Sequence, residues 1–195
     1  MAEIVNRGTG AGGANTNANG KPFEDETSNE PRLLADGFKK TVLSRTSKYG
    51  YYLKGEYDEY SVVFMSQSGL KSYIKAQWGI DLWRNPDEAY LITFNNPDER
   101  PILKILEKKE QSVEGSVETK LMSGAAFRRE YEIALGDRAI VHYAYCVNQF
   151  LKNKLESNER KYNTLKQILE EDKVPMFYGE DADYFEKLDE WIHAV

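Results

Sequence analysis

The sequence has little of what several common functional sites require. Its 195 residues include one cysteine, Cys146, and two histidines, His142 and His193. A single cysteine excludes an internal disulfide framework and any zinc site that needs several thiolates. With so few imidazoles, a metal site would have to be built from carboxylates, and carboxylates favour hard cations such as Mg²⁺.

Long apolar runs and an excess of basic residues are also missing. No run of eighteen apolar residues occurs, so the sequence predicts no membrane-spanning helix. Residues 1–20 are polar, rich in Gly and Asn, and lack the apolar core of a secretory signal, so we expect an intracellular, cytoplasmic protein. The formal net charge is −6. That charge argues against a uniformly basic, DNA-coating surface, but it leaves room for a local basic cleft.

The pattern of apolar residues along the sequence is typical of one α/β domain. Hydrophobic periodicity predicts helices over residues 22–28, 70–78, 125–135, 148–173 (broken near 157–158) and 181–193. Short β-branched and aromatic runs predict two strands within residues 49–65 and further strands over 85–94, 101–109, 138–147 and 174–178. This order predicts a central mixed β-sheet flanked by helices. We expect a flexible arm over residues 1–20 and a single domain over 21–195.

The predicted strands over residues 85–94 and 101–109 carry the most informative polar residues. They form a predicted antiparallel hairpin, and side chains alternate faces along each strand. On the second strand, apolar residues are followed on the same face by Glu107, Lys109 and Gln111. Asp87 lies about as far before the turn as Glu107 lies after it. Antiparallel pairing would therefore bring these two carboxylates to the same level of the sheet, beside the ammonium group of Lys109.

This combination has a chemical logic. Two carboxylates can hold one or two Mg²⁺ ions and leave coordination positions open. The metal would polarise a phosphoryl oxygen and lower the pKa of a bound water. A lysine could orient that water or stabilise charge in the transition state. The set suits hydrolysis of a phosphodiester bond.

The same residues resemble a known nuclease signature. Pro86-Asp87 followed by Glu107-Lys108-Lys109 resembles the hairpin motif of the PD-(D/E)XK nuclease superfamily. Gln111 is similar to a variant of that motif found in several restriction endonucleases. Residues 19–24 resemble the first helix of such enzymes, which implies that Glu24 is an accessory acid at the metal site.

Taken over its whole length, the chain resembles a small type II restriction endonuclease with a restriction-endonuclease-like domain. The resemblance implies Mg²⁺-dependent cleavage of double-stranded DNA at a short specific sequence. It also implies a homodimer, because a two-fold complex presents one active site to each strand of a palindromic target.

Several residues near the hairpin are candidates for DNA contacts. Basic side chains flank or follow the predicted site and could position DNA through its phosphates. The polar arm could also contact DNA. The candidates are Lys104, Lys108, Lys120, Arg128, Arg129, Asn15 and Asn17.

Other interpretations of the same residues stay open. Asp87 could simply start a strand, and residues 107–110 could be a solvated strand end. A strand shifted by one residue would present Glu88 in place of Asp87. Pro97-Asp98 repeats the Pro-Asp pair but lies within the turn. His142 and Cys146 are predicted to be buried core residues.

Two other functions also remain open. One is a repair or recombination nuclease of the same fold. The other is a non-catalytic protein-interaction domain, whose acidic surface would serve protein partners.

Overall fold

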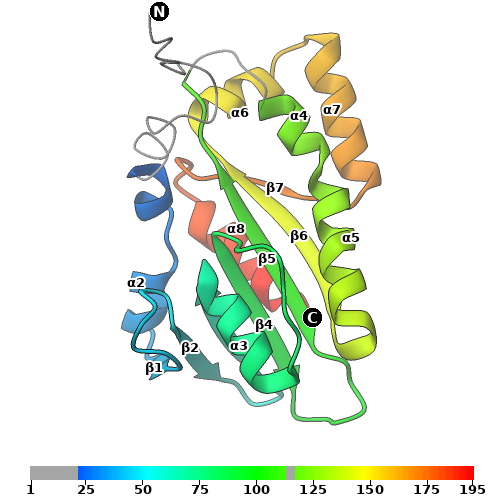
Figure 1. Ribbon diagram of the computed structural model, residues 1–195. Coiled ribbons are helices and arrows are strands. Elements are labelled where there is room, and N and C mark those ends of the chain that lie inside the picture. Colours follow the sequence, from blue (N-terminus) through cyan, green and yellow to red (C-terminus); the bar gives the residue numbers. More distant parts are fainter. Residues whose placement is uncertain (1–21, 113–116) are drawn as a thin grey trace, which may run out of the picture.

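A computed structural model describes residues 22–112 and 117–195 (Figure 1). Its centre is one seven-stranded sheet in which the strands lie in chain order. Neighbours from β1 to β5 are antiparallel, whereas β5, β6 and β7 are parallel. The predicted mixed sheet flanked by helices is therefore confirmed. The strands are β1 Lys39–Val42, β2 Tyr51–Glu56, β3 Tyr60–Ser66, β4 Glu88–Phe94, β5 Ile102–Lys109, β6 Ile140–Val147 and β7 Met176–Tyr178.

Helices cover both faces of the sheet (Figure 1). The segment 22–26 is helical and packs on one face with α2 (Glu30–Ala35) and α8 (Tyr184–His193). The other face is covered by α3 Ser68–Trp78, α4 Val117–Met122, α5 Gly124–Leu135, α6 Gln149–Leu155 and α7 Arg160–Glu171. A 3-10 turn, Gly136–Arg138, leads from α5 into β6.

The alternation of side chains along β5 explains how one strand supports both layers. Leu103 and Ile105 lie in the core beneath α3 and α5, whereas Ile102 and Leu106 lie in the core beneath α2 and α8. β5 lies inside the sheet, between β4 and β6, and buries apolar side chains on both of its faces. The polar residues that end β5 are therefore held on a rigid element.

Most of the predicted elements are found near their expected positions. Gly79 and Gly136, with φ of +71° and +55°, end α3 and α5 as glycines commonly do. The prediction missed β1, because all four of its residues are exposed and show no apolar alternation. It also missed α4, which lies between the predicted strand over 101–109 and the predicted helix over 125–135. The predicted arm over residues 1–20 lies outside the described residues.

The two predicted core residues of β6 differ. Cys146 is fully buried, as expected, whereas His142 is exposed. Burial raises the pKa of the Cys146 thiol to about 12, so this thiol stays protonated at neutral pH. No helix in the described part of the chain is long and apolar enough to cross a membrane.

Candidate active site

The register of β4 and β5 brings Asp87 to the level of Glu107. Glu88 pairs with Leu106 across the two antiparallel strands, and Asp87 and Glu107 occupy the next position outward. The backbone N–H of Lys108 donates a hydrogen bond of 2.7 Å to Oδ2 of Asp87. The two carboxylates predicted to converge do so, at the point where β4 begins and β5 nears its end.

Glu107 and Lys109 form an ion pair on the predicted common face of β5. Lys109 Nζ lies 2.7 Å from Oε1 of Glu107, and the two side chains are 22% and 24% exposed. Both follow Leu103 and Ile105 on this face. The strand thus leaves the core at a half-buried carboxylate and ammonium pair.

The carboxylates of this region act on one another electrostatically. Burial and the nearby Asp87 charge raise the pKa of Glu107, and Lys109 opposes this rise. Burial and Asp87 also raise the pKa of Glu24, while Lys108 and Lys109 lower it. Like charges held close together in a half-buried place destabilise one another's ionised forms. A divalent cation would relieve this repulsion.

Three tyrosines surround Glu107 on the side of α5. Tyr145 is its register partner on β6, and Tyr143 lies edge-on to Tyr145 with ring centroids 5.4 Å apart. Tyr131 projects from α5 into the same core. Burial raises the pKa of all three phenols, and the Glu107 charge raises them further. The neutral rings form an apolar wall against which charges at the site are weakly screened.

Gln67 belongs to the site although nothing in the sequence pointed to it. Its side-chain Nε2 donates a hydrogen bond of 3.0 Å to Oδ1 of Asp87. Its backbone N–H donates to the Pro86 carbonyl at 2.9 Å. Gln67 has φ of 49° and ψ of −124°, a conformation that favours glycine and costs a side-chain-bearing residue about 1–3 kcal/mol. A strained residue therefore holds one oxygen of Asp87.

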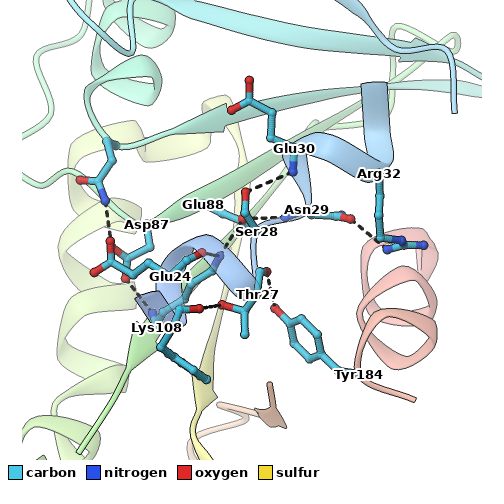
Figure 2. Close-up of polar contacts among 12 residues, drawn as sticks. Glu24, Thr27, Ser28, Asn29, Glu30, Arg32, Asp87, Glu88, Lys108 and Tyr184 are labelled. Carbon is cyan, nitrogen blue, oxygen red and sulfur yellow. Dashed lines mark hydrogen bonds and ion pairs between the residues drawn. The ribbon is translucent and has the colours of Figure 1, made fainter. Parts of the chain in front are cut away.

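Glu88 and Lys108 form a buried ion pair on the opposite face (Figure 2). The pair distance is 2.8 Å, and both side chains are almost completely buried. Lys108 Nζ also donates to the Glu24 carbonyl at 3.1 Å. Glu88 accepts hydrogen bonds from the Tyr90 hydroxyl and from the backbone of Asn29. The alternative with Glu88 as the site carboxylate does not fit this placement, and neither does a DNA contact by Lys108.

Lys104 is also placed differently from the prediction. Its side chain is buried, and its ammonium donates to the carbonyls of Trp191 and Ala194, the latter at 2.6 Å. It fixes the end of α8 against β5. An ammonium group enclosed in this way does not reach a DNA phosphate, so the prediction for Lys104 was wrong.

The remaining predicted DNA contacts differ in their surroundings. Arg128 is half-buried and donates to the Asp172 carbonyl at 2.6 Å. Arg129 is exposed and pairs with Glu132 at 3.1 Å. Lys120 is exposed on α4. Of these three, Lys120 and Arg129 are accessible to a ligand. Asn15 and Asn17 lie outside the described residues.

Gln111 lies two residues beyond Lys109, the last residue of β5. The side chain of Asn148, which caps α6, accepts from the Gln111 backbone N–H at 3.4 Å and donates to its carbonyl at 3.0 Å. These two bonds tie the chain leaving β5 to the start of α6. The backbone of Gln111 is thereby held beside the start of α6.

The donor set suits a hard cation. Within the described residues, no group of three or more His, Cys, Asp or Glu side chains is arranged to hold a metal. Mg²⁺ is often bound through one or two carboxylates, with waters and substrate oxygens completing its octahedron. Asp87 and Glu107 are the two half-buried carboxylates that could hold such an ion. No protein-family model matches this sequence, and neither a curated protein nor a solved structure matches it.

Proposed function

We propose that the chain is a Mg²⁺-dependent type II restriction endonuclease that hydrolyses double-stranded DNA at a short specific sequence. The observation that supports this best is the placement of Asp87 at the level of the Glu107–Lys109 ion pair. The resemblance to PD-(D/E)XK nucleases adds support, because that signature contains the same three residue types on a hairpin. These three side chains are therefore the ones to which the proposal assigns the reaction.

Each side chain has a distinct role in this proposal. Asp87 and Glu107 would hold one or two Mg²⁺ ions, with Glu24 as an accessory acid. When bound, Mg²⁺ supplies a Lewis acid for the phosphoryl oxygen and a water of lowered pKa. The Lys109 ammonium, held by Glu107, orients the attacking water and stabilises negative charge developing on the phosphate. Gln111 supports Lys109 from the end of β5.

The surroundings of the site fit this chemistry. The tyrosine wall behind Glu107 excludes water from one side, so charges at the site interact more strongly than they would in bulk solvent. Gln67 fixes Asp87 before a substrate arrives. Preorganised groups lower the barrier because they need not reorient during the reaction.

A homodimer would complete the enzyme. Cleaving both strands of a palindromic site needs two active sites related by a two-fold axis. Light scattering of the purified protein should give a mass near twice that of the 22.4 kDa chain, and with duplex DNA the mass should rise by that of one duplex per dimer. A monomer that stays a monomer on DNA would contradict this part of the proposal.

Digestion of a long duplex DNA of known sequence tests the activity. With Mg²⁺ we expect discrete fragments, with EDTA none, and with Lys109→Ala a rate lower by at least about 10²-fold. Lys166→Ala, on α7, is the matched control and should cleave like the wild type. Diffuse degradation would favour a repair or recombination nuclease of this fold. No cleavage by the folded wild type would favour a non-catalytic interaction protein.

A further inference from the structure

The segment from Lys39 to Lys54 has a charge opposite to that of the whole chain. Its sixteen residues contain five basic side chains and no acidic one, although the protein has a net charge of −6. The segment comprises β1, the turn and the first four residues of β2, which ends two residues later at Glu56, and we call it the basic hairpin. Its cations are Lys39, Lys40, Arg45, Lys48 and Lys54.

The turn of the basic hairpin lies at the same end of the sheet as the candidate active site. Because β1 to β4 are antiparallel in order, β1 ends where β4 begins. Ser47 in the turn contacts Ser68 at 3.1 Å between hydroxyls, and Ser68 follows Gln67, which holds Asp87. The edge strand β1 lies three strand spacings from β4, or about 14 Å.

The charges of the basic hairpin are incompletely balanced. Lys40 pairs with Glu30 at 3.6 Å, and Lys54 pairs with Glu56 at 2.7 Å. Lys39 stands directly opposite Lys54 across the two strands, and like charges in that position destabilise a sheet.

Among the described residues, three of the cations form no close ion pair, although Lys48 interacts with the Tyr49 side chain and with the charge of Asp25. Lys39, Arg45 and Lys48 are exposed and form no ion pair within the described part of the chain. A polyanion placed on the basic hairpin would neutralise this charge.

Protection of the sheet edge explains only part of this pattern. Lysines on an edge strand prevent two sheets from pairing edge to edge. That role accounts for Lys39 and Lys40 on β1. It does not account for Arg45 and Lys48, which lie in the turn beyond the strand, at the same end of the sheet as the candidate active site.

We propose that the basic hairpin binds the sugar-phosphate backbone of duplex DNA whose scissile phosphate lies at Asp87 and Glu107. This inference rests on the proposed function, since it assigns the substrate of the same site to a surface. The two sugar-phosphate backbones that border a major groove are about 12 Å apart, so one duplex can reach both the site and β1, which are separated by about 14 Å. Lys39, Arg45 and Lys48 are the phosphate contacts.

Binding without cleavage tests the assignment. The probe is a fluorescent 30-base-pair duplex in EDTA, measured by anisotropy from 50 to 200 mM salt. The variant carries Lys39→Gln, Arg45→Gln and Lys48→Gln, which leaves both ion pairs of the hairpin in place. The matched control carries Arg138→Gln, Arg160→Gln and Lys173→Gln, three exposed cations on η1, on α7 and just after α7. Both triple variants change the net charge equally, and thermal melts check that both are folded.

We expect the hairpin variant to bind at least about tenfold more weakly at 50 mM salt, with a log–log salt slope smaller by up to about 2.7. The control should keep the wild-type slope. Equal binding by the hairpin variant and the wild type would overturn the assignment, as would a loss seen only with single-stranded DNA.

A cleavage assay on the same proteins separates the two proposals. If the wild type cleaves DNA but the hairpin variant binds normally, the assignment fails and the proposed function stands. If binding depends on the hairpin but no duplex is cleaved, the assignment stands and the proposed function fails.

Discussion

The side-chain amide of Gln67 donates a hydrogen bond of 3.0 Å to Oδ1 of Asp87 from a backbone whose φ is 49°. Any residue except glycine is strained in that conformation. A substitution at this position can therefore move stability and activity in opposite directions.

Gln67→Gly tests this relationship. Glycine relieves a strain of about 1–3 kcal/mol but gains roughly 0.5–1 kcal/mol of entropy in the unfolded chain. We expect an unchanged or higher melting temperature, together with slower cleavage and a higher Mg²⁺ requirement, because Asp87 loses its anchor. Gln67→Ala, which keeps the strain, should lose activity without gaining stability. Full activity of Gln67→Gly would show that the hydrogen bond does not position Asp87.

The buried pair of Glu88 and Lys108 should act as one structural unit. Glu88→Gln or Lys108→Met alone leaves a buried group without its counter-charge, and each should cost about 3–5 kcal/mol of unfolding free energy. The double variant should cost less than the sum by roughly 1–3 kcal/mol. Urea unfolding of the four proteins measures this coupling. Strictly additive effects would mean that the two side chains do not depend on each other.

The buried ammonium of Lys104 should make the free energy of unfolding depend on pH. Burial lowers the pKa of its ammonium from 10.5 to about 8 in the folded protein. Between pH 8 and 10.5 the unfolded chain therefore binds more protons, so this group makes unfolding free energy rise with pH. The stability that the protein gains when Lys104 is neutral is lost as the pH falls from 10.5 to 8.

The variant Lys104→Met should lack this contribution. We expect the wild type to gain roughly 1 kcal/mol more than the variant between pH 8 and 9.5, and because both proteins contain the same tyrosines, tyrosine ionisation cancels in this difference. The variant should also be less stable at pH 7, because the carbonyls of Trp191 and Ala194 lose their donor. Parallel pH profiles for the two proteins would show that Lys104 titrates normally.

The hairpin of β4 and β5 was the most predictable part of the molecule. A dense turn signal between two apolar runs fixes the pairing, and alternation then places Glu107 and Lys109 on one face. Local sequence is sufficient there because the partners are joined by a short turn. The same reasoning predicted that Asp87 lies at the level of Glu107.

Long-range contacts explain what the sequence did not predict. Lysines are rarely buried, so Lys104 and Lys108 were expected on the surface. Their burial depends on α8 and on the N-terminal helix, each more than eighty residues away in the chain. The strained backbone of Gln67 depends on the path from β3 into α3, for which a single residue type gives no signal.

Two Pro-Asp pairs in this chain allow a direct test of the proposed active site. Asp87 is bonded to Gln67 and Lys108 at the level of Glu107, whereas Asp98 lies exposed in the turn after β4. The measurement is the rate of Mg²⁺-dependent cleavage of one defined duplex by the wild type, Asp87→Asn and Asp98→Asn. We predict a loss of at least about 10²-fold for Asp87→Asn and none for Asp98→Asn. Equal rates for folded Asp87→Asn and wild type would contradict an active site at Asp87.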